Sequence, residues 1–341
     1  MNNSSKKIIN LIVKLTLGLG SIVYLFYKIH QFSTDSKDNT FELLVDWWES
    51  KTIGGEWVFI GLITVVVLMI LNWMLEAWKW KLLMTKLHNV TWGLSVKSVL
   101  SGVAAGVFTP FRLGSYLGRV IHLPFKSRIL GLVLNLMSNI AQFLVTFFIG
   151  TLGLLAIVLV SDKEIILSNK IAFLSVYIYF VLLAIGLIYA FLNIGKFVHY
   201  FGYFKWTKKW IKYFRIIQHM DTEFLGKKLL VISLVRYMVI MLQYMIVFNL
   251  IQFPVPLFYV FVILASLFVT YHFLPTLSLL ELGATKAAIF ILLFEFLGLD
   301  GFDNITIGLT IVTFVIWGIN LFIPSVFGSV FLFQAKLLKE K

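Results

Sequence analysis

Residues 129–155 read ILGLVLNLMSNIAQFLVTFFIGTLGLL, a stretch without a single charged side chain. One helical crossing of a bilayer takes roughly 20 apolar residues, so this stretch is long enough to span a membrane. Its apolar residues run continuously instead of alternating, which favours a helix over a strand of a membrane barrel. This stretch therefore predicts a transmembrane helix.

Similar apolar stretches recur along the chain. They lie near 8–29, 57–75, 171–195, 229–251, 257–275, 284–299 and 304–335. The whole sequence is 60% hydrophobic and 13% charged, with a mean hydropathy of +0.94, whereas soluble domains carry about 25% charged residues. We therefore predict an all-α integral membrane protein, in which residues 1–341 form a single polytopic membrane domain with about eight transmembrane helices.

The basic residues predict the orientation of this bundle. The net charge is +13, but Lys and Arg lie beside apolar stretches among Trp and Tyr, which favours a membrane surface over nucleic acid as the partner. The segment 33–56 is acidic, whereas 76–97, 196–228 and 336–341 are basic. The positive-inside rule then places both termini in the cytoplasm and the protein in the cytoplasmic (inner) membrane.

A moderately apolar segment at about 98–121 does not fit this alternation. It lies between Lys97 and Lys126, both on the inner side by the charge rule, and is too short to cross twice. We expect a re-entrant pair of short helices that breaks near Thr109 and Pro110, because proline disfavours helix at the residue before it. Broken backbone at membrane depth must be buried in protein or line a wet cavity, so a cavity is expected near 109–119.

A second unusual segment lies at about 199–220. Its Trp and Tyr residues follow one helical stripe and its Lys and Arg residues another. This pattern predicts an amphipathic helix lying flat on the inner membrane surface. A solvated linker between two halves of the protein is the alternative.

The densest group of polar residues surrounds the predicted break. Spacings of three, four and seven place Arg112, Ser115, Tyr116 and Arg119 on one helical face. Arg suits bidentate contact with phosphate, and the helix start after Pro110 would add amide donors. A phospholipid headgroup is the expected ligand, unless both arginines only extend to the inner headgroups.

Glycines accompany these arginines at four-residue spacing. The pairs are Gly102 with Gly106 and Gly114 with Gly118. Such pairs allow two backbones to approach closely. We expect tight helix packing around the arginines.

The second group of polar residues is Pro275, Glu281, Gly283 and Lys286, in another break within an apolar stretch. Burying Glu281 or Lys286 alone would be costly, so they are expected to pair with each other, or Glu281 with one of the arginines. Interfacial charges in a short cytoplasmic loop are the alternative.

Other polar residues lie within the predicted spans. Asn135, Asn139 and Gln142 follow one stripe, which predicts hydrogen bonds between helices more than substrate contact. Arg236 and Glu295 are the two span residues to test first. The chain has no cysteine, no histidine pair at metal-ligand spacing and no nucleotide-binding loop, which predicts neither a metal nor a cofactor and argues against an enzyme.

Two motifs give a family resemblance. Trp78-Lys79-Trp80-Lys81-Leu82-Leu83 and Pro110-Phe111-Arg112-Leu113-Gly114 with Arg119 resemble the flippase-like transmembrane domain of lysylphosphatidylglycerol synthases. Late in the chain, Pro275, Glu281, Gly283 and Lys286 are similar to that family's acidic and basic turn. The resemblance covers most of the chain and implies lipid translocation.

The sequence also departs from that family. Family members often carry an acidic residue where this chain has Ser115, and another where it has Asn135 or Asn139. The full synthases add a soluble domain after the membrane domain, and this sequence ends at Lys341. The resemblance thus argues against aminoacyl transfer.

The functional hypothesis is movement of a phospholipid or lipid-linked anion between leaflets. Arg112, Arg119, Ser115 and Tyr116 would bind the headgroup, Glu281 and Lys286 would gate or balance charge, and the break at Thr109-Pro110, with Gly114, Pro275 and Gly283, would shape the cavity. The expected partners are membrane phospholipids, anionic ones above all. A homo-oligomer or a membrane-protein partner stays open.

Two other functions remain as alternatives. The first is a membrane enzyme or accessory subunit that acts on lipid-linked precursors, and the second is a structural component of a larger complex.

Overall fold

The computed structural model describes residues 55–85, 87–107, 109, 112–161, 168–196, 222–273, 284–297 and 305–334. All regular structure in these ranges is helical, which confirms the predicted all-α class. The predicted first span at 8–29, the surface helix at 199–220 and the second group's Pro275, Glu281 and Gly283 lie outside the described residues, as does Pro110.

The apolar stretches that fall on described residues are helical, as predicted. The helices that contribute to candidate spans are α3 (Gly55–Met84), α6 (Arg128–Val160), α8 (Lys170–Leu192), α11 (Thr222–Leu250), α14 (Ile305–Trp317) and α15 (Ile323–Phe333). A single 3-10 turn, η1 (Phe125–Ser127), leads into α6. By length and hydropathy, five helical segments qualify as membrane spans among the described residues: 55–84, 125–160, 170–192, 222–250 and 307–333.

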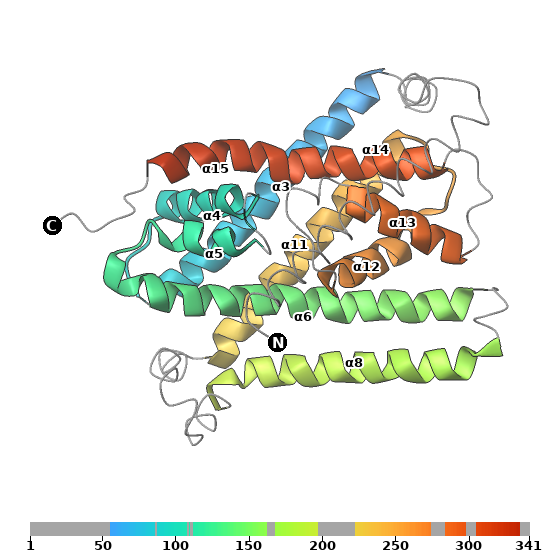
Figure 1. The fold of residues 1–341 in the computed structure, drawn as a ribbon, viewed down its shortest axis with the longest axis horizontal. Coiled ribbons are helices and arrows are strands. Elements are labelled where there is room, and N and C mark those ends of the chain that lie inside the picture. The colour runs from blue at the N-terminus through green and yellow to red at the C-terminus, as the bar shows by residue number, and fades with distance from the viewer. Residues whose placement is uncertain are drawn as a thin grey trace, which may run out of the picture.

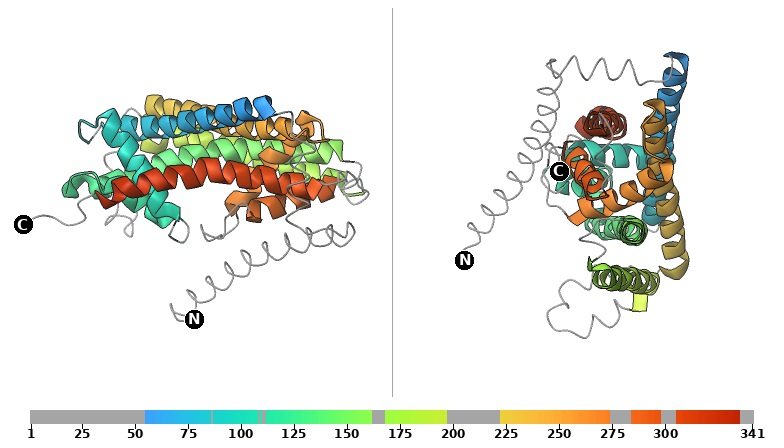
Figure 2. Two further views of the ribbon diagram at one scale, coloured as in Figure 1. Left: turned by 90° about the horizontal axis from the view of Figure 1, so that it is seen from above. Right: turned by 90° about the vertical axis from the view of Figure 1, so that its right-hand side faces the viewer.

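Helices α6 and α8 and the continuous α14–α15 run along the long axis of the molecule, and α3 and α11 cross it obliquely (Figures 1 and 2). Helices α4 (Trp92–Val107) and α5 (Leu113–Val120) lie toward one end, and α12 (Leu257–Phe273) and α13 (Ala284–Leu297) toward the other (Figure 1). The apolar core has two main parts, one among α11 to α14 and one among α3 to α6.

Apolar side chains cover much of the outer surface. On α8, Ile178, Tyr179 and Leu182 are exposed, and only Ala184 and Phe191 of the whole helix are buried. Contiguous apolar surface of this kind is unfavourable in water, whereas lipid tails solvate it well. The exposed surface therefore agrees with a membrane protein.

Helix α3 is longer than the sequence pattern predicted. The apolar stretch was expected to end near residue 75 and a basic loop to follow, but the helix continues to Met84. Trp80, Leu83 and Met84 are fully buried in the core beside α4 and α6. Helical packing thus extends about two turns beyond the continuous apolar run.

Helices α4 and α5 form a tight hairpin. Helix α4 begins at Trp92, earlier than the expected Ser98, and the hydroxyl of Thr91 accepts a hydrogen bond from the amide of Leu94 at its start (3.3 Å). The break falls where it was predicted, between Val107 and Leu113.

The four glycines face the contact between α4 and α5. A methyl group on Gly118 would lie 2.5 Å from the carbonyl oxygen of Ser101, and one on Gly102 would lie 2.6 Å from Cγ of Arg119. No side chain larger than hydrogen fits either position without displacing its neighbour. The predicted close packing around the arginines is confirmed.

One helix contains a wide turn. The five residues of η2 (Gly318–Phe322) form a π-helical turn that joins α14 to α15 without interruption. In this turn, the carbonyl oxygen of Asn320 accepts a hydrogen bond from Nε1 of Trp73 on α3 (3.2 Å). Turns of this kind are frequent at functional sites.

Candidate functional site

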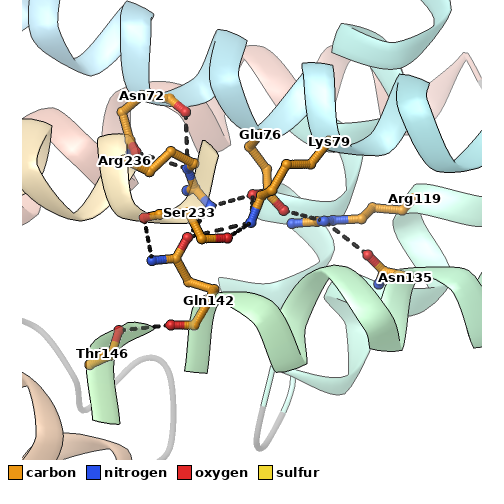
Figure 3. Close-up of polar contacts among 9 residues, drawn as sticks. All are labelled: Asn72, Glu76, Lys79, Arg119, Asn135, Gln142, Thr146, Ser233 and Arg236. Carbon is orange, nitrogen blue, oxygen red and sulfur yellow. Dashed lines mark hydrogen bonds and ion pairs between the residues drawn. The ribbon is translucent and has the colours of Figure 1, made fainter. Parts of the chain in front are cut away.

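A single buried carboxylate, that of Glu76 on α3, gathers three cations from three helices (Figure 3). It forms ion pairs with Lys79 on the same helix (3.0 Å), with Arg119 on α5 (2.5 Å) and with Arg236 on α11. Glu76 is 2% exposed and Lys79 is fully buried. We call these four residues the charge cluster.

Helical spacing and close packing position the cluster. Glu76 and Lys79 are three residues apart and therefore lie on one face of α3. Glycines 102 and 118 let α5 approach α4 closely enough to bring Arg119 toward that face. Glu76 lies eight residues before the end of α3, about 12 Å along the helix axis, and thus well inside a candidate span.

Polar side chains around the cluster form further hydrogen bonds with it (Figure 3). Arg119 donates to Oδ1 of Asn135 (2.9 Å), and Arg236 donates through Nε to Oδ1 of Asn72 (3.0 Å). Gln142 on α6 accepts from Arg236 (3.2 Å) and Lys79 (3.4 Å), and donates to the carbonyl of Ser233 (3.3 Å). Asn135 and Gln142 therefore make the hydrogen bonds between helices that their stripe predicted.

The charge cluster is not neutral. Within the part of the chain that the structure describes, three cations against one carboxylate leave two positive charges in a site with little exposure to solvent. Nε of Arg119 is also buried without a hydrogen-bond partner among the described residues. Buried charge without compensation is costly, so such a site favours an anion.

A cavity of about 360 Å³ lies directly against the cluster. Arg119, a member of the cluster, and Gln142, which accepts hydrogen bonds from it, both line the cavity. Further polar groups come from Arg112, Ser115, Tyr116 and Asn139. Trp73 and Phe143 supply apolar walls, and His272, near the end of α12, also lines the cavity. The size falls in the range of small-molecule sites.

The structure brings all four residues of the predicted helical face to this cavity, namely Arg112, Ser115, Tyr116 and Arg119. Arg112 precedes α5 in the left-handed backbone region, with φ 54°. The hydroxyl of Thr109 accepts a hydrogen bond from the amide of Gly114 (2.7 Å). One of the amide donors expected for phosphate is therefore used within the hairpin.

The second predicted group is only partly described. Lys286 on α13 places its ammonium group 4.9 Å from the ring centre of Tyr271 on α12. Glu295, which was singled out for testing, lies half-buried on α13. Arg236, the other residue singled out, is a member of the charge cluster.

Sequence reasoning missed the carboxylate at the centre. The sequence predicts a basic loop at 76–97, and this prediction is wrong for Glu76 and Lys79, because both are buried in α3. The predicted pairing of Glu281, with Lys286 or with one of the arginines, lies outside the described residues, and among the described residues the carboxylate that pairs with Arg119 is that of Glu76. The available signal was the helical spacing of Glu76, Lys79, Trp80 and Leu83, which continues the buried face of the preceding span.

Among the described residues, no group of His, Asp or Glu side chains is arranged to hold a metal ion. No protein family, curated protein or solved structure matches the chain. The likeness of its two motifs to the lysylphosphatidylglycerol synthase domain is therefore carried forward as a proposal.

Proposed function

We propose that this protein binds the phosphate of an anionic lipid in the cavity beside the charge cluster and moves that lipid between the leaflets of the cytoplasmic membrane. The observation that carries the proposal is the two excess positive charges of the charge cluster, counted among the described residues and buried directly against a cavity. A phosphate group is the common membrane anion that would compensate them.

The placement of the two arginines supports an anionic ligand that offers pairs of oxygen atoms, as a phosphate does. Arg112 and Arg119 reach the same cavity from the start and the end of α5. A guanidinium group presents its N–H donors in a fork that matches two phosphate oxygens, whereas an ammonium group acts as a point charge. Ser115 and Tyr116 add hydroxyl groups for the remaining oxygens.

The proposal includes the arrangement in the membrane. The five candidate spans, together with the apolar stretch at 8–29, α12 and α13, give about eight crossings, with both termini in the cytoplasm. The α4–α5 hairpin enters and leaves on the cytoplasmic side as a re-entrant pair, since α5, with 8 residues, is far too short to return across the membrane. The resemblance to the flippase-like domain agrees with this arrangement.

The test is lipid movement in proteoliposomes that contain a headgroup-labelled phosphatidylglycerol. Wild-type protein should accelerate movement over protein-free liposomes, and Arg112→Lys should slow it about tenfold or more, because Lys keeps the charge and loses the fork. Arg128→Lys is the matched control. Arg128 donates to the carbonyls of Leu123 and Ile121 outside the cavity, so this variant should keep the wild-type rate.

Two results would contradict the proposal. Equal rates for wild type and Arg112→Lys, at matched protein incorporation, would remove the cavity from the mechanism. No movement with wild-type protein would favour the alternative of an accessory protein for lipid-linked precursors.

A further inference from the structure

An apolar groove of about 270 Å³ lies beside the cavity, on the outer face of α3, α4 and α15. Its lining is almost entirely apolar and includes Ile70, Met74, Val99, Leu100, Ile323 and Phe327. Ile70 and Phe327 are more than half exposed. In a membrane, the mouth of the groove therefore meets the lipid tails.

The groove and the cavity share their walls. Trp73 lines both of them, and it is held in place by its hydrogen bond to Asn320. Helix α4 contributes Val103 and Gly106 to the cavity and Val99 to the groove, and the chain from η2 to α15 contributes Leu321 to one and Ile323 to the other. The two spaces thus adjoin along three segments.

We infer that the groove holds an acyl chain of the same lipid whose phosphate occupies the cavity, so that the ligand is a membrane lipid and not a soluble phosphate compound. This inference rests on the proposed function. A lipid that lifts its headgroup into a polar cavity must still keep its tails in apolar surroundings, because transfer of each methylene to a polar site costs about 0.8 kcal/mol. An apolar groove that opens to the bilayer and adjoins the cavity meets this requirement.

The experiment uses proteoliposomes with a phosphatidylglycerol that carries a diazirine at the end of one acyl chain. After irradiation, mass spectrometry maps the labelled peptides. Label on α4 and on the start of α15 should exceed label on α8 several-fold, because α8 exposes its apolar side chains to bulk lipid and reports the background.

Two further experiments test whether binding of an acyl chain in the groove depends on the phosphate in the cavity. Diacylglycerol with the same diazirine has acyl chains and no phosphate, and it should label the groove no more than α8. Ile70→Trp, which fills the groove mouth, should remove the excess labelling by phosphatidylglycerol, whereas Ile63→Trp, two helical turns away on the same exposed side of α3, should retain it.

Equal labelling of the groove and α8 by phosphatidylglycerol would overturn the inference. This is the result expected if a partner helix, and not an acyl chain, fills the groove. An equal excess with diacylglycerol would also overturn it, because the groove would then act independently of the phosphate. Binding of soluble glycerophosphoglycerol, measured by calorimetry, separates the two proposals. If glycerophosphoglycerol binds but the groove is not labelled, only this inference is contradicted. If neither binding nor groove labelling is observed, the proposed function is contradicted as well.

Discussion

Replacing Glu76 by Gln tests the charge cluster most directly. Gln keeps the shape of the side chain and one acceptor oxygen, but it removes the only carboxylate that Lys79, Arg119 and Arg236 share among the described residues. Removing one partner of a buried ion pair costs about 3–5 kcal/mol, because the other charge stays buried and unpaired. Since three cations depend on this one carboxylate, we expect at least that loss.

The measurement is unfolding by sodium dodecyl sulfate in mixed micelles, followed by tryptophan fluorescence. A loss of about 3–5 kcal/mol lowers the folding equilibrium constant by roughly two to three and a half orders of magnitude. The matched control is Glu223→Gln. Glu223 pairs with Lys227 at 2.6 Å, but both side chains are at least 60% exposed, so its loss should cost less than about 1 kcal/mol.

A double variant makes the test specific to charge. Adding Lys79→Gln to Glu76→Gln removes one of the cations left without compensation, so it should recover at least about 1 kcal/mol of the loss. The reasoning is refuted if Glu76→Gln lowers the free energy of unfolding no more than Glu223→Gln does. It is also refuted if Lys79→Gln lowers that free energy by the same amount in the Glu76→Gln background as in the wild type. Either result would mean that the cations do not depend on the carboxylate.

Two further predictions concern the hairpin. Gly118→Ala should lower the free energy of unfolding by about 1–3 kcal/mol, because the added methyl group meets the carbonyl of Ser101. The control is Gly186→Ala on α8, where the methyl group meets nothing within 4 Å, and this variant should be neutral or stabilising. Equal losses for the two variants in the same detergent titration would contradict the close packing of the hairpin. Burial, with Lys97 and Arg128 nearby, lowers the pKa of His122 below its usual 6.5, so the unfolded chain binds a proton that the folded protein does not and stability should fall as the pH drops below about 6.5. His122→Gln should reduce that fall between about pH 7.5 and 5.5, and an unchanged slope would exclude this histidine as its source.

The fold class could be predicted because uninterrupted apolar runs leave few alternatives. The run at 129–155 became α6, and the helical break near Thr109 followed from a segment too short to cross twice. The length of α3 could not be predicted in the same way. Hydropathy treats Glu76 and Lys79 as marks of a loop, and it does not detect that each compensates the other inside a helix.

The sequence predicted some residues of the site and missed their partners on other helices. Helical spacing was sufficient to predict that Arg112 and Arg119 lie at one site, since both belong to one short segment, although Arg112 precedes α5 and is not part of its helical face. The partners of Arg119 come from α3 and α6, and those of Arg236 from α3 and α6 as well. Contacts between helices far apart in the sequence depend on how the helices pack, and spacing along one helix does not contain that information.

The wide turn of η2 changes what the helix beyond it can contact. One extra residue per turn rotates all later side chains by about 100° around the helix axis. Helix α14 packs against α11 and α13, and α15 packs against α4. An unbroken α-helix would present a different set of side chains to α4. The rotational offset at Gly318–Phe322 therefore lets one continuous helix pack against α11 and α13 before the turn and against α4 after it.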